Sequence, residues 1–132
     1  MRTAVSGHLS GGESVTVNIL GTPYAVTVKK YEEEEAFARR SICGFCDGYT
    51  KVIVVCDMST YKGWENEPPE TIDAAQKQTM RHEIVHAFFD ESGLMDSSLA
   101  YDSGWSQNEE MVDWIANQGA KIYAAWQEAG AL

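Results

Sequence analysis

The sequence predicts one α+β domain in which a small twisted sheet packs against two long helices. Two alternating, β-branched segments near the N-terminus and one apolar segment further on predict the strands. Two segments with helical periodicity in the second half predict the helices. The 132 residues suffice for a single domain of two or three layers, and no repeat or linker divides residues 1–132.

The first expected element is a β-hairpin. Ser14–Leu20 alternates between polar and apolar side chains, residues 21–23 (Gly-Thr-Pro) form a turn signal, and Tyr24–Lys30 alternates again. A short helix should follow over Glu32–Arg40, because glutamates open this segment and arginines close it, which matches the helix dipole. We expect the glutamate run to be a solvated first turn rather than a metal site.

The middle of the chain contains one strong strand signal. Cys43–Gly48 is turn-like, whereas Lys51–Cys56 is apolar and β-branched and should be a strand buried on both faces. Ser59–Glu70 should be a loop, because it contains a glycine and a Pro-Pro pair.

Two helices are expected after this loop. Asp73 is a suitable N-cap with Gln76 three residues later, and Gly93 is a natural stop. Apolar residues on two adjacent stripes of this helix predict that it is deeply buried. After a loop, the last helix should run over Asn108–Gln127.

The charge of the chain limits its partners. With 20 acidic and 10 basic residues, the net charge is −10, so the surface should repel nucleic acid and favour a basic or neutral polypeptide. Met1–Gly12 lacks a secretory apolar core, and no apolar run approaches the roughly 18 residues of a membrane span. We therefore expect a soluble, cytoplasmic protein without a membrane partner.

Three cysteines, Cys43, Cys46 and Cys56, are expected to be reduced, because an odd number without a signal peptide argues against a disulfide framework. The Cys-x-x-Cys spacing of the first two also occurs in metal and redox sites. A second zinc would need Cys56 and His8 to complete four ligands. Small buried hydrophobic side chains are the favoured interpretation.

The motif that indicates chemistry is His82-Glu83-Ile84-Val85-His86, which matches H-E-x-x-H. Four residues advance a helix by slightly more than one turn, so both imidazoles project from one side and can reach one metal ion. Glu83 lies about a quarter turn away and can act on a water without binding the metal. The alternative is two hydrogen-bonded histidines beside a salt-bridged glutamate.

A catalytic zinc takes three protein ligands, and a carboxylate from the last helix is the expected third. Glu109 and Asp113 are four residues apart and share a helix face, so Glu109 can bind the metal while Asp113 accepts a hydrogen bond from a ligating histidine. Glu110 is the rival ligand. The alternative for Glu109 is a capping box with Ser106.

H-E-x-x-H followed by N-E-x-x-x-D resembles the gluzincin pattern of thermolysin-type peptidases. The resemblance implies that Glu109 binds zinc and that Asp113 supports a histidine. The small size, the order of elements and the segments Cys46–Lys51, Arg81–Leu94 and Glu109–Ala116 are similar to small phage and mobile-element proteins grouped with the ImmA/IrrE-like metallopeptidases. This similarity implies a minimal zincin-like fold, a Zn²⁺ cofactor and a protein or peptide substrate, such as a transcriptional regulator.

The expected reaction is peptide hydrolysis, with Glu83 as the general base for the attacking water. Tyr101, in the loop between the two ligand helices, is a candidate second donor to the oxyanion, ahead of Tyr49 and His8. A peptide could also pair with an exposed strand edge beside the site. The alternatives are a catalytically silent zinc-binding interaction module and a metal-dependent hydrolase acting on RNA or a small molecule.

Overall fold

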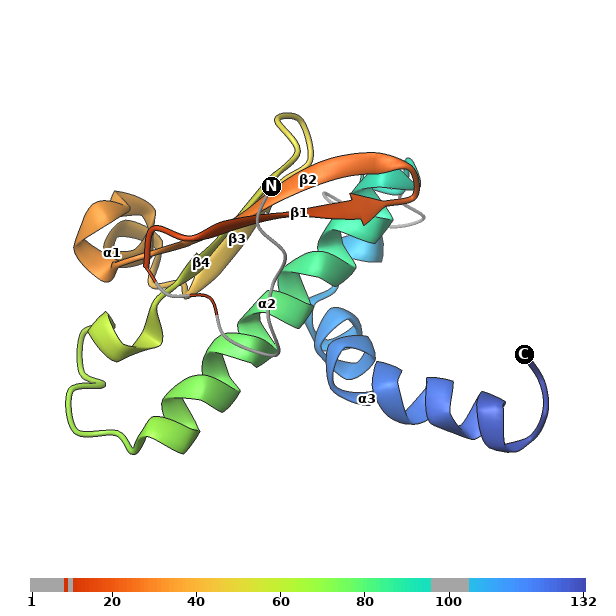
Figure 1. The fold of residues 1–132 in the computed structure, drawn as a ribbon. Helices are drawn as coiled ribbons and strands as arrows, with labels where there is room; N and C mark the ends of the chain where they lie inside the picture. Colours follow the sequence, from red (N-terminus) through yellow and green to blue (C-terminus); the bar gives the residue numbers. More distant parts are fainter. Residues whose placement is uncertain (1–8, 10, 96–104) are drawn as a thin grey trace.

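A computed structural model describes residues 9, 11–95 and 105–132, and the described residues form an α+β fold, as the sequence predicts (Figure 1). Three single-turn 3₁₀ segments accompany the longer elements. In chain order the elements are β1 (Ser14–Ile19), β2 (Thr22–Lys29), η1 (Tyr31–Glu33), α1 (Glu35–Arg40), β3 (Gly44–Asp47), β4 (Val52–Cys56), η2 (Met58–Thr60), α2 (Pro69–Glu91), η3 (Trp105–Gln107) and α3 (Glu109–Glu128).

The sheet has the order β1-β2-β4-β3, with β2 and β4 parallel and both outer pairs antiparallel. The β1–β2 hairpin is confirmed, but its turn is Leu20-Gly21 rather than residues 21–23. Both turn residues have positive φ, 52° and 91°, the combination of the two-residue turn that suits the twist of a hairpin. Thr22 and the following proline therefore belong to β2, on the sheet.

The prediction of a turn at Cys43–Gly48 is wrong for most of the segment. Gly44–Asp47 is β3, an edge strand that pairs with β4. Its glycine resembles a turn signal locally, but pairing with the apolar β4, a non-local interaction, makes it a strand. The prediction for β4 is confirmed, since Ile53–Cys56 is buried.

Each face of the sheet has its own apolar core. Alternate residues of β4 point to opposite faces, with Ile53 and Val55 on one and Val54 and Cys56 on the other. The first face packs against α2 through Ala87 and is crossed diagonally by this helix (Figure 1). The second face is covered by α1 and η2, with a core of Phe37, Val54, Cys56 and Met58.

Helix α2 begins four residues before the predicted cap at Asp73. Pro68 is the N-cap and Pro69 the first helical residue, a position where the fixed φ and missing N–H of proline cost little. Its end before Gly93, which has a φ of 80°, agrees with the prediction. The expectation of a deeply buried helix is wrong, because only a few of its residues are buried and Phe88 is 41% exposed.

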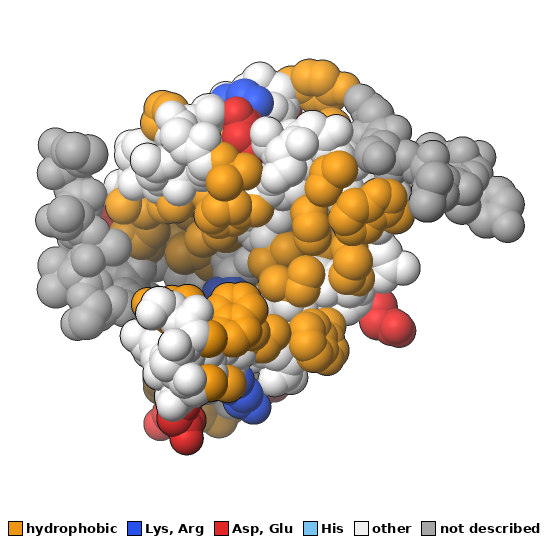
Figure 2. Space-filling model, turned by 90° about the vertical axis from the view of Figure 1, so that its right-hand side faces the viewer, with side chains coloured by type: hydrophobic (Ala, Val, Ile, Leu, Met, Phe, Trp, Pro, Cys, Tyr) orange, Lys and Arg blue, Asp and Glu red, His pale blue; other side chains and the backbone are white. Residues whose placement is uncertain are grey.

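Helix α3 crosses α2 and packs on it through Val112 and Ala116, while Arg81 donates from Nε to the Ala116 carbonyl at 3.0 Å. Its C-terminal half extends away from the sheet (Figure 1). Large apolar side chains of α3 remain exposed, including Trp114 and Trp126, and hydrophobic side chains gather on the face in Figure 2. No helix within the described ranges is both long and apolar enough to span a membrane.

Candidate metal centre

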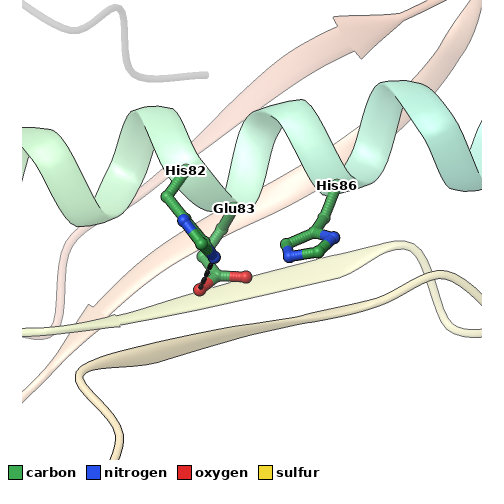
Figure 3. Close-up of side chains that lie close together, drawn as sticks. All are labelled: His82, Glu83 and His86. Carbon is green, nitrogen blue, oxygen red and sulfur yellow. Dashed lines mark ion pairs between the residues drawn. The ribbon is translucent and has the colours of Figure 1, made fainter. Parts of the chain in front are cut away.

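Helix α2 presents His82, Glu83 and His86 on one side, and their possible ligand atoms all lie within 4.8 Å of one another. Figure 3 shows the three side chains pointing from the helix toward β3 and β4. The two imidazole rings are 4.9 Å apart between centroids, as expected for an i, i+4 pair. This group could hold a metal ion, so the helical spacing in the sequence does produce a convergent cluster of donors.

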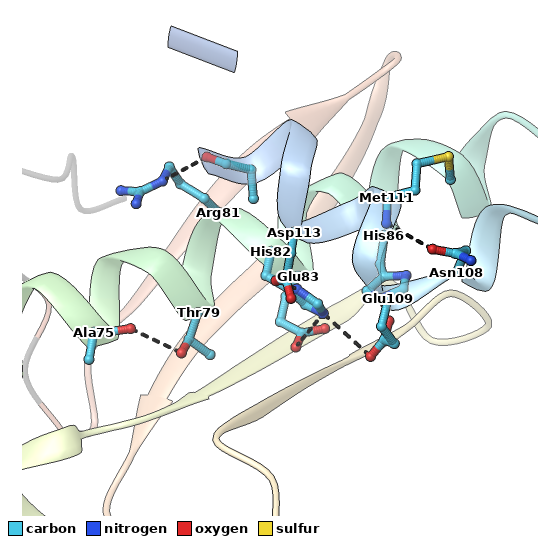
Figure 4. Close-up of polar contacts among 11 residues, drawn as sticks. Ala75, Thr79, Arg81, His82, Glu83, His86, Asn108, Glu109, Met111 and Asp113 are labelled. Atoms are coloured by element: carbon cyan, nitrogen blue, oxygen red, sulfur yellow. Dashed lines mark hydrogen bonds and ion pairs between the residues drawn. The ribbon is translucent and has the colours of Figure 1, made fainter. Parts of the chain in front are cut away.

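Helix α3 brings Glu109 to both imidazoles (Figure 4). Glu109 Oε1 lies 2.7 Å from His86 Nε2, and Oε2 lies 3.6 Å from His82 Nε2. The carboxylate thus lies beside the Nε2 atom of each ring. Glu109 is the first residue of α3, where the positive end of the helix dipole favours a carboxylate.

Ser106 and Glu110, the residues on which the two rival interpretations depend, have other surroundings in the structure. The capping box is wrong, because the Ser106 hydroxyl donates to the Leu94 carbonyl at 2.7 Å and Asn108 is the N-cap. Asn108 Oδ1 accepts from the Met111 N–H at 2.8 Å. Glu110 is exposed and lines a separate surface hollow with aromatic side chains. The Glu109 carboxylate is therefore not used as a cap and is available to the cluster.

Asp113, one helical turn after Glu109, contacts the other nitrogen of His82. Its Oδ1 lies 2.6 Å from His82 Nδ1. A carboxylate accepts, so the proton of the neutral ring belongs on Nδ1 and the lone pair on Nε2 is left facing Glu109. The contact fixes the ring orientation and the tautomer that a metal ligand requires.

Glu83 is a buried carboxyl group, with 7% of its surface exposed. Burial, the largest cause, and the nearby carboxylates of Glu109 and Asp113 raise its pKa from 4.5 to about 7, against the opposing effect of His82 and Arg40. Its nearest ion-pair contact joins Oε2 to His82 Nε2 at 4.0 Å, longer than a hydrogen bond. A carboxyl group with such a pKa can both accept and donate a proton near neutral pH.

Gly44 was not among the predicted site residues, but it lets β3 approach α2 closely. A Cβ on Gly44 would lie 2.9 Å from Thr79 Cγ2, 2.9 Å from the Val54 carbonyl oxygen and 3.5 Å from Glu83 Cγ. Only a residue without a side chain fits between α2 and β4 here. In the sequence, the only indication of this close approach was a glycine in the segment before the predicted strand Lys51–Cys56.

A cleft of about 580 Å³ lies over the cluster, between α2, the edge strand β3 and the end of α1. A second hollow of about 380 Å³ adjoins it on the side of Trp64. Tyr49 lines the main cleft but is 81% exposed. Tyr101 and His8 lie outside the described residues, so the structure does not place them.

The cysteines do not gather at one site. Cys43, just before β3, and Cys56 pack in the core on the α1 face, whereas Cys46 packs in the core under α2. Burial raises the pKa of Cys46 above its usual range and that of Cys56 to about 12. All three are free thiols, and these two stay protonated at neutral pH.

Comparison with protein-family models, characterised proteins and solved structures gave no match. Two imidazoles and the nearby Glu109 carboxylate form a donor set typical of catalytic zinc. In such sites a ligating histidine commonly donates its other ring N–H to a carboxylate, and Asp113 is in that position on His82.

Proposed function

We propose that this protein is a zinc-dependent peptidase of the gluzincin type. His82, His86 and Glu109 hold the metal, Asp113 orients His82, and Glu83 is the general base. The proposal rests on two contacts made by α3. The Glu109 carboxylate lies beside the Nε2 atoms of His82 and His86, and the Asp113 carboxylate contacts His82 Nδ1. The contacting residues come from different helices: His86 and Glu109 are 23 positions apart in the chain, and His82 and Asp113 are 31 positions apart.

The bound zinc would supply a Lewis acid for the scissile carbonyl and a more acidic water. The protein side chains handle the proton. Glu83, with a pKa near 7, takes the proton of the attacking water and gives it to the leaving amine. Its burial excludes bulk water from the carboxyl group.

The edge strand β3 supports an extended peptide as the substrate. The Cys56 N–H donates to the Cys43 carbonyl at 2.7 Å, and alternation along the strand then turns the backbone groups of Gly44 and Cys46 away from β4. Those groups border the main cleft. A peptide that adds to this edge would lie beside Glu83. The net charge of −10 favours a peptide over RNA.

The test combines metal analysis with cleavage of a peptide mixture. Wild-type protein should bind one Zn²⁺ and cleave, whereas Glu83→Gln should keep the zinc and lose cleavage. Glu110→Gln, a change in the neighbouring exposed glutamate, is the matched control and should behave as wild type. Protein that binds zinc but cleaves nothing, with a fourth protein ligand detected by X-ray absorption, would instead favour a silent interaction module.

A further inference from the structure

Arg40, the last residue of α1, is a cation on the wall of the main cleft. Its side chain is exposed and forms no ion pair with any other described residue. Its neighbour Arg39 also borders the cleft but is paired with Glu35, from Nε to Oε1 at 3.3 Å. The two adjacent arginines therefore differ in whether their charge is available.

Four of the acidic side chains that line the same cleft have a close partner. Glu34 pairs with Lys29 at 3.2 Å, and Asp47 Oδ1 accepts the N–H groups of Tyr49 and Thr50 at 2.9 and 3.1 Å. Glu109 contacts His86, and Asp90 accepts from Cys46. The cleft carries more acidic than basic side chains, and Arg40 is the arginine on its wall that has no ion pair with a described residue.

Arg40 is also near the reacting groups. Arg40 and the proposed base, Glu83, line the same cleft. Helix α1 packs on the sheet face that carries Phe45, opposite to the face under α2. In a peptide paired with β3, successive side chains would alternate between the side of α2 and the side of Arg40.

We propose that Arg40 determines specificity by binding an acidic side chain of a peptide held along β3. This inference rests on the proposed peptidase site and names its substrate class: peptides with aspartate or glutamate close to the scissile bond. A planar guanidinium binds a carboxylate through two parallel hydrogen bonds, a geometry that an amide side chain cannot match. The surrounding negative charge disfavours long acidic runs, so a single acidic residue is selected.

The probes are short peptide hydroxamates, whose metal-binding end fixes them in a zinc site without turnover. Pairs that differ only in Asp against Asn, at each of the first three positions from the hydroxamate, are titrated by calorimetry into zinc-loaded protein. We expect Asp to bind about fivefold tighter than Asn at one position, as for a partly exposed ion pair. Arg40→Gln should remove this preference, and Arg40→Glu should reverse it, so that Asn binds more tightly than Asp.

Arg39→Gln is the matched control and should keep the preference, since that arginine is already paired. Arg40→Lys should retain part of it, which separates the role of charge from any effect on folding, and thermal melts check that all variants fold. Equal binding of Asp and Asn peptides to wild type would overturn the role of Arg40 and leave the metal site intact. Failure of every hydroxamate to bind zinc-loaded protein would overturn both proposals.

Discussion

The substitution Gly44→Ala tests whether the approach of β3 to α2 is as tight as the structure indicates. The added Cβ would lie 2.9 Å from Thr79 Cγ2 and from the Val54 carbonyl oxygen, whereas ordinary contacts start at 3.4 Å. Something must move by the difference, 3.4 − 2.9 = 0.5 Å. The Val54 carbonyl belongs to the central part of the sheet, so the strain falls on β3 and on Thr79.

Overpacking of this kind costs about 1–3 kcal/mol. The loss of chain entropy in the unfolded state offsets roughly 0.4–1 kcal/mol of it. At the midpoints of these ranges the net destabilisation is about 1.3 kcal/mol, and an unfolding entropy of about 0.28 kcal/mol/K for 132 residues converts it to a Tm lowered by about 5 °C. The ligands come from α2 and α3, so zinc affinity should change little.

The assay is thermal unfolding followed by circular dichroism. Gly119→Ala is the matched control: a Cβ there meets no atom within 4 Å, and alanine in a helix interior should stabilise the protein by about 0.5–1 kcal/mol. Thr79→Ser removes Cγ2 but keeps the hydroxyl that donates to the Ala75 carbonyl, so adding it to Gly44→Ala should recover part of the loss. An unchanged or raised Tm for Gly44→Ala alone would refute the packing argument.

The remaining predictions concern α3 and an ion pair remote from the site. Glu109→Ala should weaken zinc affinity by more than roughly 10–100-fold and Asp113→Ala by about that amount, measured by competition with a chelator, while Glu110→Ala changes nothing. Hydrogen bonds and the ion pair with Lys51 lower the pKa of Glu91 from 4.5 to about 2, so its contribution to stability is complete above pH 4.5 and is lost as the pH falls toward 2. Between pH 6 and pH 3, the free energy of unfolding should therefore fall less in Glu91→Gln than in wild type; equal losses in urea melts would count against this ion pair.

Local spacing was enough to predict the central part of the site. An i, i+4 pair of histidines on a helix must share a side, and the same rule placed Glu109 and Asp113 together on the last helix. The apolar run of β4 similarly required no tertiary information. What these signals could not establish was that the two helices cross with Glu109 between the imidazoles, since this depends on how α3 packs on α2.

The errors arose where a non-local interaction or a special backbone position decides the structure. Gly44 looked like part of a turn, but pairing with β4 makes it an edge strand. Pro69 was treated as a breaker although it begins α2, and Leu20 adopts a positive φ that its residue type does not suggest. Arg40 had no recognisable signal, because its place on the cleft depends on α1 packing against the opposite face of the sheet.

The charges around the cluster favour a cation over a purely structural set of contacts. If Glu83 served to neutralise His82, the two should form a close ion pair, yet they are 4.0 Å apart and the pKa of the buried carboxyl group is raised to about 7. Glu109 and Asp113 contact the histidines but add negative charge near Glu83, so the buried Glu83 carboxyl group is left without a close partner. A divalent cation bound here would attract all three carboxylates and would offset the repulsion between them. Zn²⁺ should therefore raise the Tm of the wild type but not of His82→Ala, and equal melting of both proteins with and without the metal would favour the structural interpretation.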